Sequence, residues 1–228
     1  MPRNKYPEET REKIIETSLK LFVQKGYDQT TVLDIVANLG GLTRGAFYHH
    51  FKSKEEVLEA IYAGNEMGWD VFEKARNTKG ANGLQKLRIA LTESLKTNTA
   101  TEHNKEITML YVQLIMSPRF LEEKVKGDIE TARLMEPFIA EGMIDGSIPS
   151  GYPPRLLAEL FMLMVNFWMM PTIYPATPEE MWQKGEMMEK VLEALNFPLL
   201  DDKLEEVYTN LMQTVFMPEF GDMNKTEE

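Results

Sequence analysis

Apolar residues recur along this chain at spacings of three and four, and this periodicity is the feature that most narrows its fold. An early example is the set Ile15, Leu19 and Phe22. No run of alternating apolar and polar residues is long enough to predict a strand. We therefore expect an all-α protein. The expected helices cover residues 8–25, 31–39, 43–51, 54–77, 84–99, 104–116, 118–143, 154–170, 178–196 and 202–217.

Charge and methionine content divide the chain into two parts. Residues 1–60 carry nine basic and nine acidic residues, so the formal net charge of −11 belongs entirely to the remainder. Apart from Met1, every methionine lies at Met67 or beyond. We expect an N-terminal domain over residues 1–60, a second helical domain over 61–220 and a disordered tail over 221–228. A net negative charge argues against a nucleic-acid partner for the second part but not for the neutral first part.

Several function classes lack the residues they require. The sequence contains no cysteine, which excludes disulfides, thiolate nucleophiles and cysteine-based zinc sites. Histidine occurs only as the adjacent pair His49–His50 and at His103, so we expect no metal site. No H-E-x-x-H, P-loop, G-x-G-x-x-G or G-x-S-x-G pattern is present. We expect a protein without a cofactor that is not an enzyme.

One apolar segment, Leu156–Ile173, is long enough to be weighed as a membrane span. Against a span, it contains Glu159, Asn166 and Pro171, and no basic cluster flanks it. We expect a buried or interfacial helix instead. The first residues lack the apolar stretch of a secretory signal, which indicates a cytoplasmic protein.

The most informative segment is a series of three short helices near the N-terminus. The first ends at Gly26, and Thr30 or Thr31 is suited to cap the second. A tight turn, Leu39-Gly-Gly-Leu42, leads to a third helix that Thr43 can cap. A supporting helix followed by helix, glycine turn and helix is the plan of a helix-turn-helix.

The third helix has two chemically different faces. Phe47 and Phe51 lie four residues apart and are expected to point into a three-helix core. The other face then presents Arg44, Tyr48 and His49, with His50 at one flank. An arginine in the first turn suits guanine O6 and N7, and the small Gly45 and Ala46 allow close approach to a groove. The phenol, the imidazoles and Lys54 suit phosphate oxygens. The same pattern also fits an ordinary amphipathic core helix.

These residues resemble a known family. The segments Thr30-Thr-Val-Leu-Asp-Ile35 and Thr43-Arg-Gly-Ala-Phe-Tyr-His-His-Phe-Lys-Ser-Lys54 look like the TetR family of transcriptional regulators over residues 8–65. The resemblance implies a homodimeric, all-helical repressor with an N-terminal DNA-binding domain and a C-terminal domain for ligand binding and dimerisation. By position it implies base reading by Thr43, Arg44, Gly45 and Ala46, and phosphate contacts by Thr30, Thr31, Tyr48, His50 and Lys54, with His49 beside them.

The turn departs from the family pattern. Ile35 and Gly45 are ten positions apart, one more than the pattern has. We expect the second glycine of the turn to absorb the extra residue. The register of the second helix against the third is left open.

The second domain is rich in methionine and aromatic residues, which suit both a core and an adaptable binding surface. By family analogy the expected pocket residues are Trp69, Met109, Tyr111, Met116, Met135 and Phe138. The helices expected at 154–170, 178–196 and 202–217 would pack across a dimer axis.

The sequence thus predicts a ligand-responsive repressor that binds a palindromic double-stranded DNA operator as a homodimer. The expected effector is a small apolar or amphipathic molecule. The alternatives are a helical enzyme or lipid- or small-molecule-binding protein that does not bind DNA, and a TetR-like activator.

Overall fold

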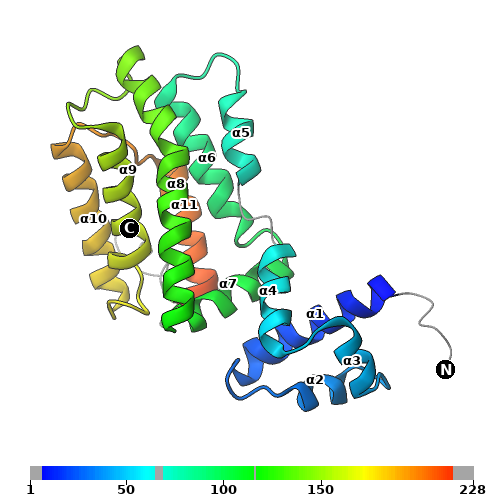
Figure 1. Ribbon diagram of the computed structural model, residues 1–228. Coiled ribbons are helices and arrows are strands. Elements are labelled where there is room, and N and C mark those ends of the chain that lie inside the picture. The colour runs from blue at the N-terminus through cyan, green and yellow to red at the C-terminus, as the bar shows by residue number, and fades with distance from the viewer. Residues whose placement is uncertain (1–6, 65–68, 116, 218–228) are drawn as a thin grey trace. The chain divides into compact units, whose positions relative to one another are not determined.

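The computed structural model describes residues 7–64, 69–115 and 117–217. Over these residues it contains eleven α-helices, two π-helical segments and no strand, which confirms the all-α prediction (Figure 1). The contacts divide the chain into two compact units. The first is Met1–Glu66 with Glu102–Leu114, and the second is Met67–Thr101 with Ile115–Glu228. The tail expected at 221–228 lies outside the described residues.

The first unit is built around its longest helix, α1. Its members are α1 (Pro7–Lys25), α2 (Val32–Asn38), α3 (Arg44–His50), α4 (Lys54–Gly64) and α7 (Glu102–Leu114). Helix α1 packs against α2, α4 and α7, and α2 packs against α3 (Figure 1). The fully buried apolar side chains at its centre include Ile14, Leu19, Phe22, Ile35, Leu39, Phe47, Val57 and Leu110.

The position of α7 differs from the expected division at residue 60. This helix is far along the chain, yet it packs on α1 and buries Ile107 and Leu110. Its Gln113 side chain also donates a hydrogen bond to the carbonyl oxygen of Val23, at 3.2 Å. The apolar periodicity of α7 predicts that it is helical, but it does not indicate which partner covers the apolar face.

The second unit is a helical bundle with α8 at its centre. Its members are α5 (Trp69–Arg76), α6 (Gly83–Thr97), α8 (Pro118–Asp145), α9 (Pro154–Leu163), the π-helical η1 (Met164–Trp168), α10 (Pro178–Ala194), α11 (Asp202–Leu211) and the π-helical η2 (Met212–Phe216). Helix α8 packs against α6 and α9, while α6 also contacts α5 and α11. Residues 65–68, between α4 and α5 in the helix expected at 54–77, lie outside the described residues.

The segment weighed as a membrane span forms most of α9 and η1. Leu157 and Phe161 are buried in the core of the second unit, whereas Leu156 and Leu163 are exposed. None of the described helices is both long and apolar enough to cross a bilayer.

The missing side chain of Gly83 allows α6 to meet the backbone of α8 at Gly142. A Cβ atom on Gly83 would lie 2.1 Å from the amide nitrogen of Gly142 and 2.5 Å from the carbonyl oxygen of Phe138. The end of α8 also caps α6, because the Gly83 N–H donates to Asp145 Oδ2 at 2.8 Å and the Leu84 N–H donates to the Ser147 hydroxyl at 3.2 Å. The first two amides of α6 therefore have hydrogen-bond acceptors in Asp145, the last residue of α8, and in Ser147 just beyond it.

Candidate nucleic-acid interface

Helix α3 presents the two faces that the sequence predicts. Thr43 caps it by accepting a hydrogen bond from the Ala46 N–H at 3.2 Å. Phe47 is fully buried and Phe51 nearly so, which anchors the helix to the core of the first unit. The exposed residues are Thr43, Arg44, Gly45, Tyr48 and His49. Several of the residues that the resemblance assigns to base or phosphate contacts are thus exposed together on α3.

Arg44 and Tyr48 form a pair along this surface. The guanidinium carbon of Arg44 lies 5.3 Å from the centroid of the Tyr48 ring, and Nη2 donates to the phenol oxygen at 3.4 Å. The nearest atom to a Cβ on Gly45 would be the Thr43 hydroxyl oxygen, at 3.7 Å. Together with the half-buried Ala46, Gly45 leaves the first turn of α3 without bulk between Arg44 and Tyr48.

The turn between α2 and α3 accommodates its extra residue with two glycines. Gly40 has φ +63° and Gly41 has φ +98°, both in the left-handed region that glycine adopts without strain. The turn therefore uses both glycines, not only the second. Leu39 stays fully buried before the turn, as do Ile35 on α2 and Phe47 on α3. The longer connection leaves the apolar faces of both helices in the core.

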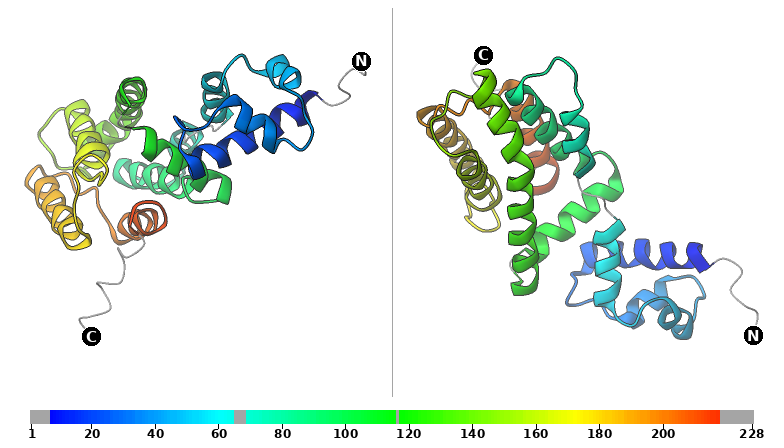
Figure 2. Two further views of the ribbon diagram at one scale, coloured as in Figure 1. Left: turned by 90° about the horizontal axis from the view of Figure 1, so that it is seen from below. Right: turned by 45° about the horizontal axis from the view of Figure 1, so that its top comes forward.

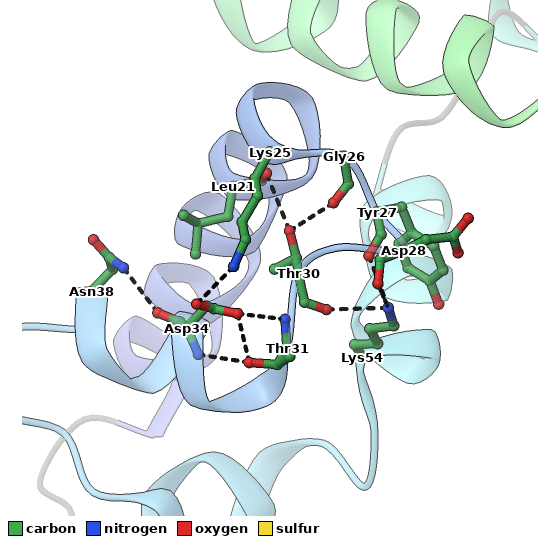
Figure 3. Close-up of polar contacts among 10 residues, drawn as sticks. All are labelled: Leu21, Lys25, Gly26, Tyr27, Asp28, Thr30, Thr31, Asp34, Asn38 and Lys54. Atoms are coloured by element: carbon green, nitrogen blue, oxygen red, sulfur yellow. Dashed lines mark hydrogen bonds and ion pairs between the residues drawn. The ribbon is translucent and has the colours of Figure 1, made fainter.

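The loop before α2 places the two adjacent threonines in different environments. Thr30 is fully buried, and its hydroxyl donates to the carbonyl oxygens of Gly26 at 2.8 Å and Leu21 at 3.3 Å (Figure 3). Thr31 is exposed and caps α2. The resemblance assigns both residues to phosphate, but the Thr30 side chain is directed into the protein and holds the loop to α1.

Asp34 connects the cap of α2 to α1. Its Oδ2 accepts from the Thr31 N–H at 2.8 Å, and its own N–H donates to Thr31 Oγ1 at 3.1 Å, which completes a capping box (Figure 3). Lys25 Nζ lies 2.9 Å from Asp34 Oδ1. The hydrogen bond from Lys25, followed by those from the Thr31 hydroxyl and amide, holds the pKa of Asp34 far below its ordinary value.

This arrangement predicts a pH-dependent stability for the first unit. A carboxyl whose pKa is lowered by folding stabilises the protein above its unfolded pKa of about 4, and the contribution is lost as the pH falls toward the folded pKa. We expect Asp34→Asn to lower the thermal unfolding midpoint at pH 7. The difference in midpoint between this variant and the original protein should become smaller below about pH 4. Circular dichroism melts at several pH values measure it. A gap that stays constant down to pH 2 would contradict the role given to the Asp34 charge.

The two adjacent histidines differ in exposure. His49 is exposed, whereas His50 is half-buried, and burial is the main cause that lowers the pKa of His50, with the nearby His49 next. The neutral form of His50 is thus favoured near pH 7. Among the described residues there is no group of three or more His, Cys, Asp or Glu side chains that could hold a metal ion.

The Lys54 side chain makes its contacts within the first unit. Lys54 opens α4, and its ammonium nitrogen lies on backbone carbonyl oxygens of the loop between α1 and α2 (Figure 3). The phosphate contact that the resemblance implies for Lys54 stays a prediction.

The residues expected around an effector are divided between the two units. Exposed Met109 and half-buried Tyr111 belong to α7 in the first unit. Met135 and Phe138 are buried in the core of the second unit. Met116 and the side chain of Trp69 lie outside the described residues.

The second unit also contains a buried charged cluster that the sequence reading did not single out. The Lys124 side chain is 2% exposed, and its ammonium lies 2.8 Å from Asp128 Oδ2. Asn166 of η1 donates to Asp128 Oδ1 at 3.1 Å. Burial is the main cause that lowers the pKa of Lys124 and raises that of Asp128. In the sequence, only the spacing of Lys124 and Asp128, one helical turn apart, indicates that they pair. That spacing is equally typical of an ion pair on the surface, so it does not predict burial.

The helix-turn-helix region is similar to a known family. Residues 14–61 match the family of bacterial regulatory proteins described as the tetR family. The chain is 48% identical over 59 residues to the HTH-type transcriptional regulator SrpR of Pseudomonas putida, which covers 26% of this chain and 27% of SrpR. It is 34% identical over 103 residues to the HTH-type transcriptional regulator AcrR of Shigella flexneri, covering 45% of this chain and 47% of AcrR. The alignments thus span less than half of either relative.

The fold as a whole is also similar to that of solved proteins. The putative TetR-family transcriptional regulator from Syntrophomonas wolfei aligns over 86% of this chain and 98% of its own, with a TM-score of 0.58 and 21% identity. At that identity the likeness concerns the fold alone. It extends over both units, whereas the sequence matches centre on the first.

Proposed function

We propose that this chain, whose N-terminal helices form the helix-turn-helix domain of the tetR family of bacterial regulatory proteins, is a DNA-binding transcriptional regulator. The observation that carries the proposal is the surface of α3. Arg44, Tyr48 and His49 are exposed on it while Phe47 anchors the opposite face. Such a helix can enter a major groove with its N-terminal residues at the base edges.

The proposed active form is a homodimer that is held together by α9 and α10. These helices lie side by side along one edge of the second unit (Figures 1 and 2). They expose the large apolar side chains Leu156, Leu163, Met187 and Val191. A second copy of the chain would cover them in a two-fold, self-complementary contact. The two copies of α3 would then reach successive major grooves, roughly 34–36 Å apart, on a palindromic operator.

The proposed regulation is repression relieved by a small apolar or amphipathic effector in the second unit. The core of that unit is rich in methionine, including Met135, Met162, Met181 and Met188, and methionine adapts to irregular ligands. An effector would act by its difference in affinity between the DNA-binding and non-binding arrangements. In this proposal the protein works in the cytoplasm, where its operator lies, and it carries no catalytic role.

Selection of bound DNA from a random pool tests the proposal directly. The expected result is an enriched sequence with two-fold symmetry. Absence of enrichment at low salt would favour a helical binding protein or enzyme that does not bind DNA. With the operator known, a reporter gene placed behind it separates a repressor from an activator, because both need the same DNA contacts.

Arg44→Ala is expected to cost about 1–3 kcal/mol of binding free energy on the selected operator and to relax preference at one base pair. The reason is that a guanidinium in the first turn of α3 can donate two hydrogen bonds to one guanine. Fluorescence anisotropy with the operator and with random DNA measures both effects. An equal loss on the two DNAs would mean that Arg44 contacts only phosphate.

A further inference from the structure

The ammonium group of Lys54 is held by three backbone carbonyls. Nζ donates to the carbonyl oxygens of Tyr27 at 2.8 Å, Thr30 at 3.1 Å and Asp28 at 3.3 Å. Figure 3 shows the lysine reaching from α4 to the loop that joins α1 to α2. An ammonium has three N–H donors, and three acceptors surround this one. A phosphate would therefore have to displace one of these carbonyls.

Tyr27 makes the second half of the same junction. Lys54 Nζ lies 4.3 Å from the centroid of the Tyr27 ring, and the Tyr27 hydroxyl donates to Glu55 Oε1 at 3.1 Å. On its other side the ring meets Phe22 of α1 edge to face, with 5.0 Å between centroids. The first turn of α4 thus contacts the loop through the Lys54 ammonium and the Glu55 carboxylate. Phe22 of α1 packs against the Tyr27 ring.

We propose that Lys54 is a positioning residue. It fastens the loop before α2 to the first turn of α4, so that α4 and the helix-turn-helix move as one body. The inference rests on the proposed function, since it concerns how the DNA-reading helices are held.

The experiment compares Lys54→Met and Lys54→Arg in the full chain, with Lys52→Met as the matched control. Lys52 is an exposed lysine that is two residues earlier in the chain. Two readouts are needed: the slope of log affinity against log salt concentration on the selected operator, and hydrogen exchange of residues 26–35 in the free protein. A guanidinium retains the positive charge but cannot direct three donors from one nitrogen to converging carbonyls.

Lys54→Met is expected to bind operator about tenfold more weakly with an unchanged salt slope, and to exchange faster over residues 26–35. Lys54→Arg is expected to share the faster exchange, while Lys52→Met matches the original protein in exchange. A phosphate contact would behave differently, since Lys54→Met would then lower the slope by about 0.9 and Lys54→Arg would restore binding.

That second pattern, or unchanged exchange in both Lys54 variants, would overturn the positioning role. If Lys54→Met fails to fold, the exchange and the operator affinity of Lys54→Arg decide, because faster exchange with weakened binding supports the positioning role and unchanged exchange with full binding overturns it. Failure of the proposed function gives a separate result, because the original protein would then select no DNA while exchange in the free protein still tests the junction.

Discussion

Replacing Leu163 with aspartate should turn the proposed dimer into a monomer and weaken operator binding by about 100-fold or more. Leu163 is 56% exposed on α9, so the change should leave the folded unit intact. At the centre of a two-fold contact, however, each dimer would bury two unpaired carboxylates. A monomer brings only one copy of α3 to the DNA. It therefore loses the higher operator affinity that two linked copies of α3 give the dimer.

Sedimentation equilibrium and anisotropy with the operator measure the two effects. The matched control is Ile144→Asp, an equally drastic change at a side chain that is 88% exposed on α8, outside the α9–α10 pair. The control should remain dimeric and bind normally. A Leu163→Asp protein that stays dimeric with full affinity would exclude α9 from the interface. Circular dichroism must show unchanged helicity for either result to count.

The largest expected effect on stability comes from Gly83→Ala. The added methyl group would overlap backbone atoms of α8, and the nearest of them, the Gly142 amide nitrogen, would be 2.1 Å away. Backbone cannot rotate aside as a flexible side chain does, so α6 and α8 must move apart. We expect a loss of at least about 3 kcal/mol in the free energy of unfolding. Separation would also weaken the hydrogen bond from the Gly83 N–H to Asp145.

Gly127→Ala is the control for that substitution. Gly127 also lies within a helix, α8, but a Cβ there would have no neighbour within 4 Å. It should be neutral or stabilise the protein by about 0.5–1 kcal/mol, because alanine favours the helix. Urea unfolding followed by circular dichroism compares the pair. Similar stabilities for both variants would contradict the tight crossing of α6 and α8.

Much of α3 could be predicted because its determinants are local. A threonine cap and two phenylalanines four residues apart specify where the helix begins and which side is buried, and the structure agrees. The glycine pair Gly40–Gly41 was similarly recognisable as a turn, although only the backbone angles show that both residues adopt positive φ.

The direction of polar side chains could not be predicted in the same way. Thr30 and Lys54 match positions that the family resemblance assigns to phosphate, yet both donate to backbone carbonyls within the first unit. A lysine at the start of a helix is equally able to face solvent, a phosphate or a loop. The choice depends on where the Tyr27–Thr30 carbonyls lie, and these belong to a segment more than twenty residues earlier.

The sequence by itself determined that the chain is helical, that its first sixty residues carry a helix-turn-helix, and which face of α3 is exposed. These properties follow from periodicity and caps, which act over a few residues. Only the tertiary structure decided that α7 joins the first unit, that Lys124 is buried against Asp128, and that Gly83 meets Gly142. These three features depend on contacts between distant segments or on burial produced by packing. The local spacing of residues in the sequence does not specify such features.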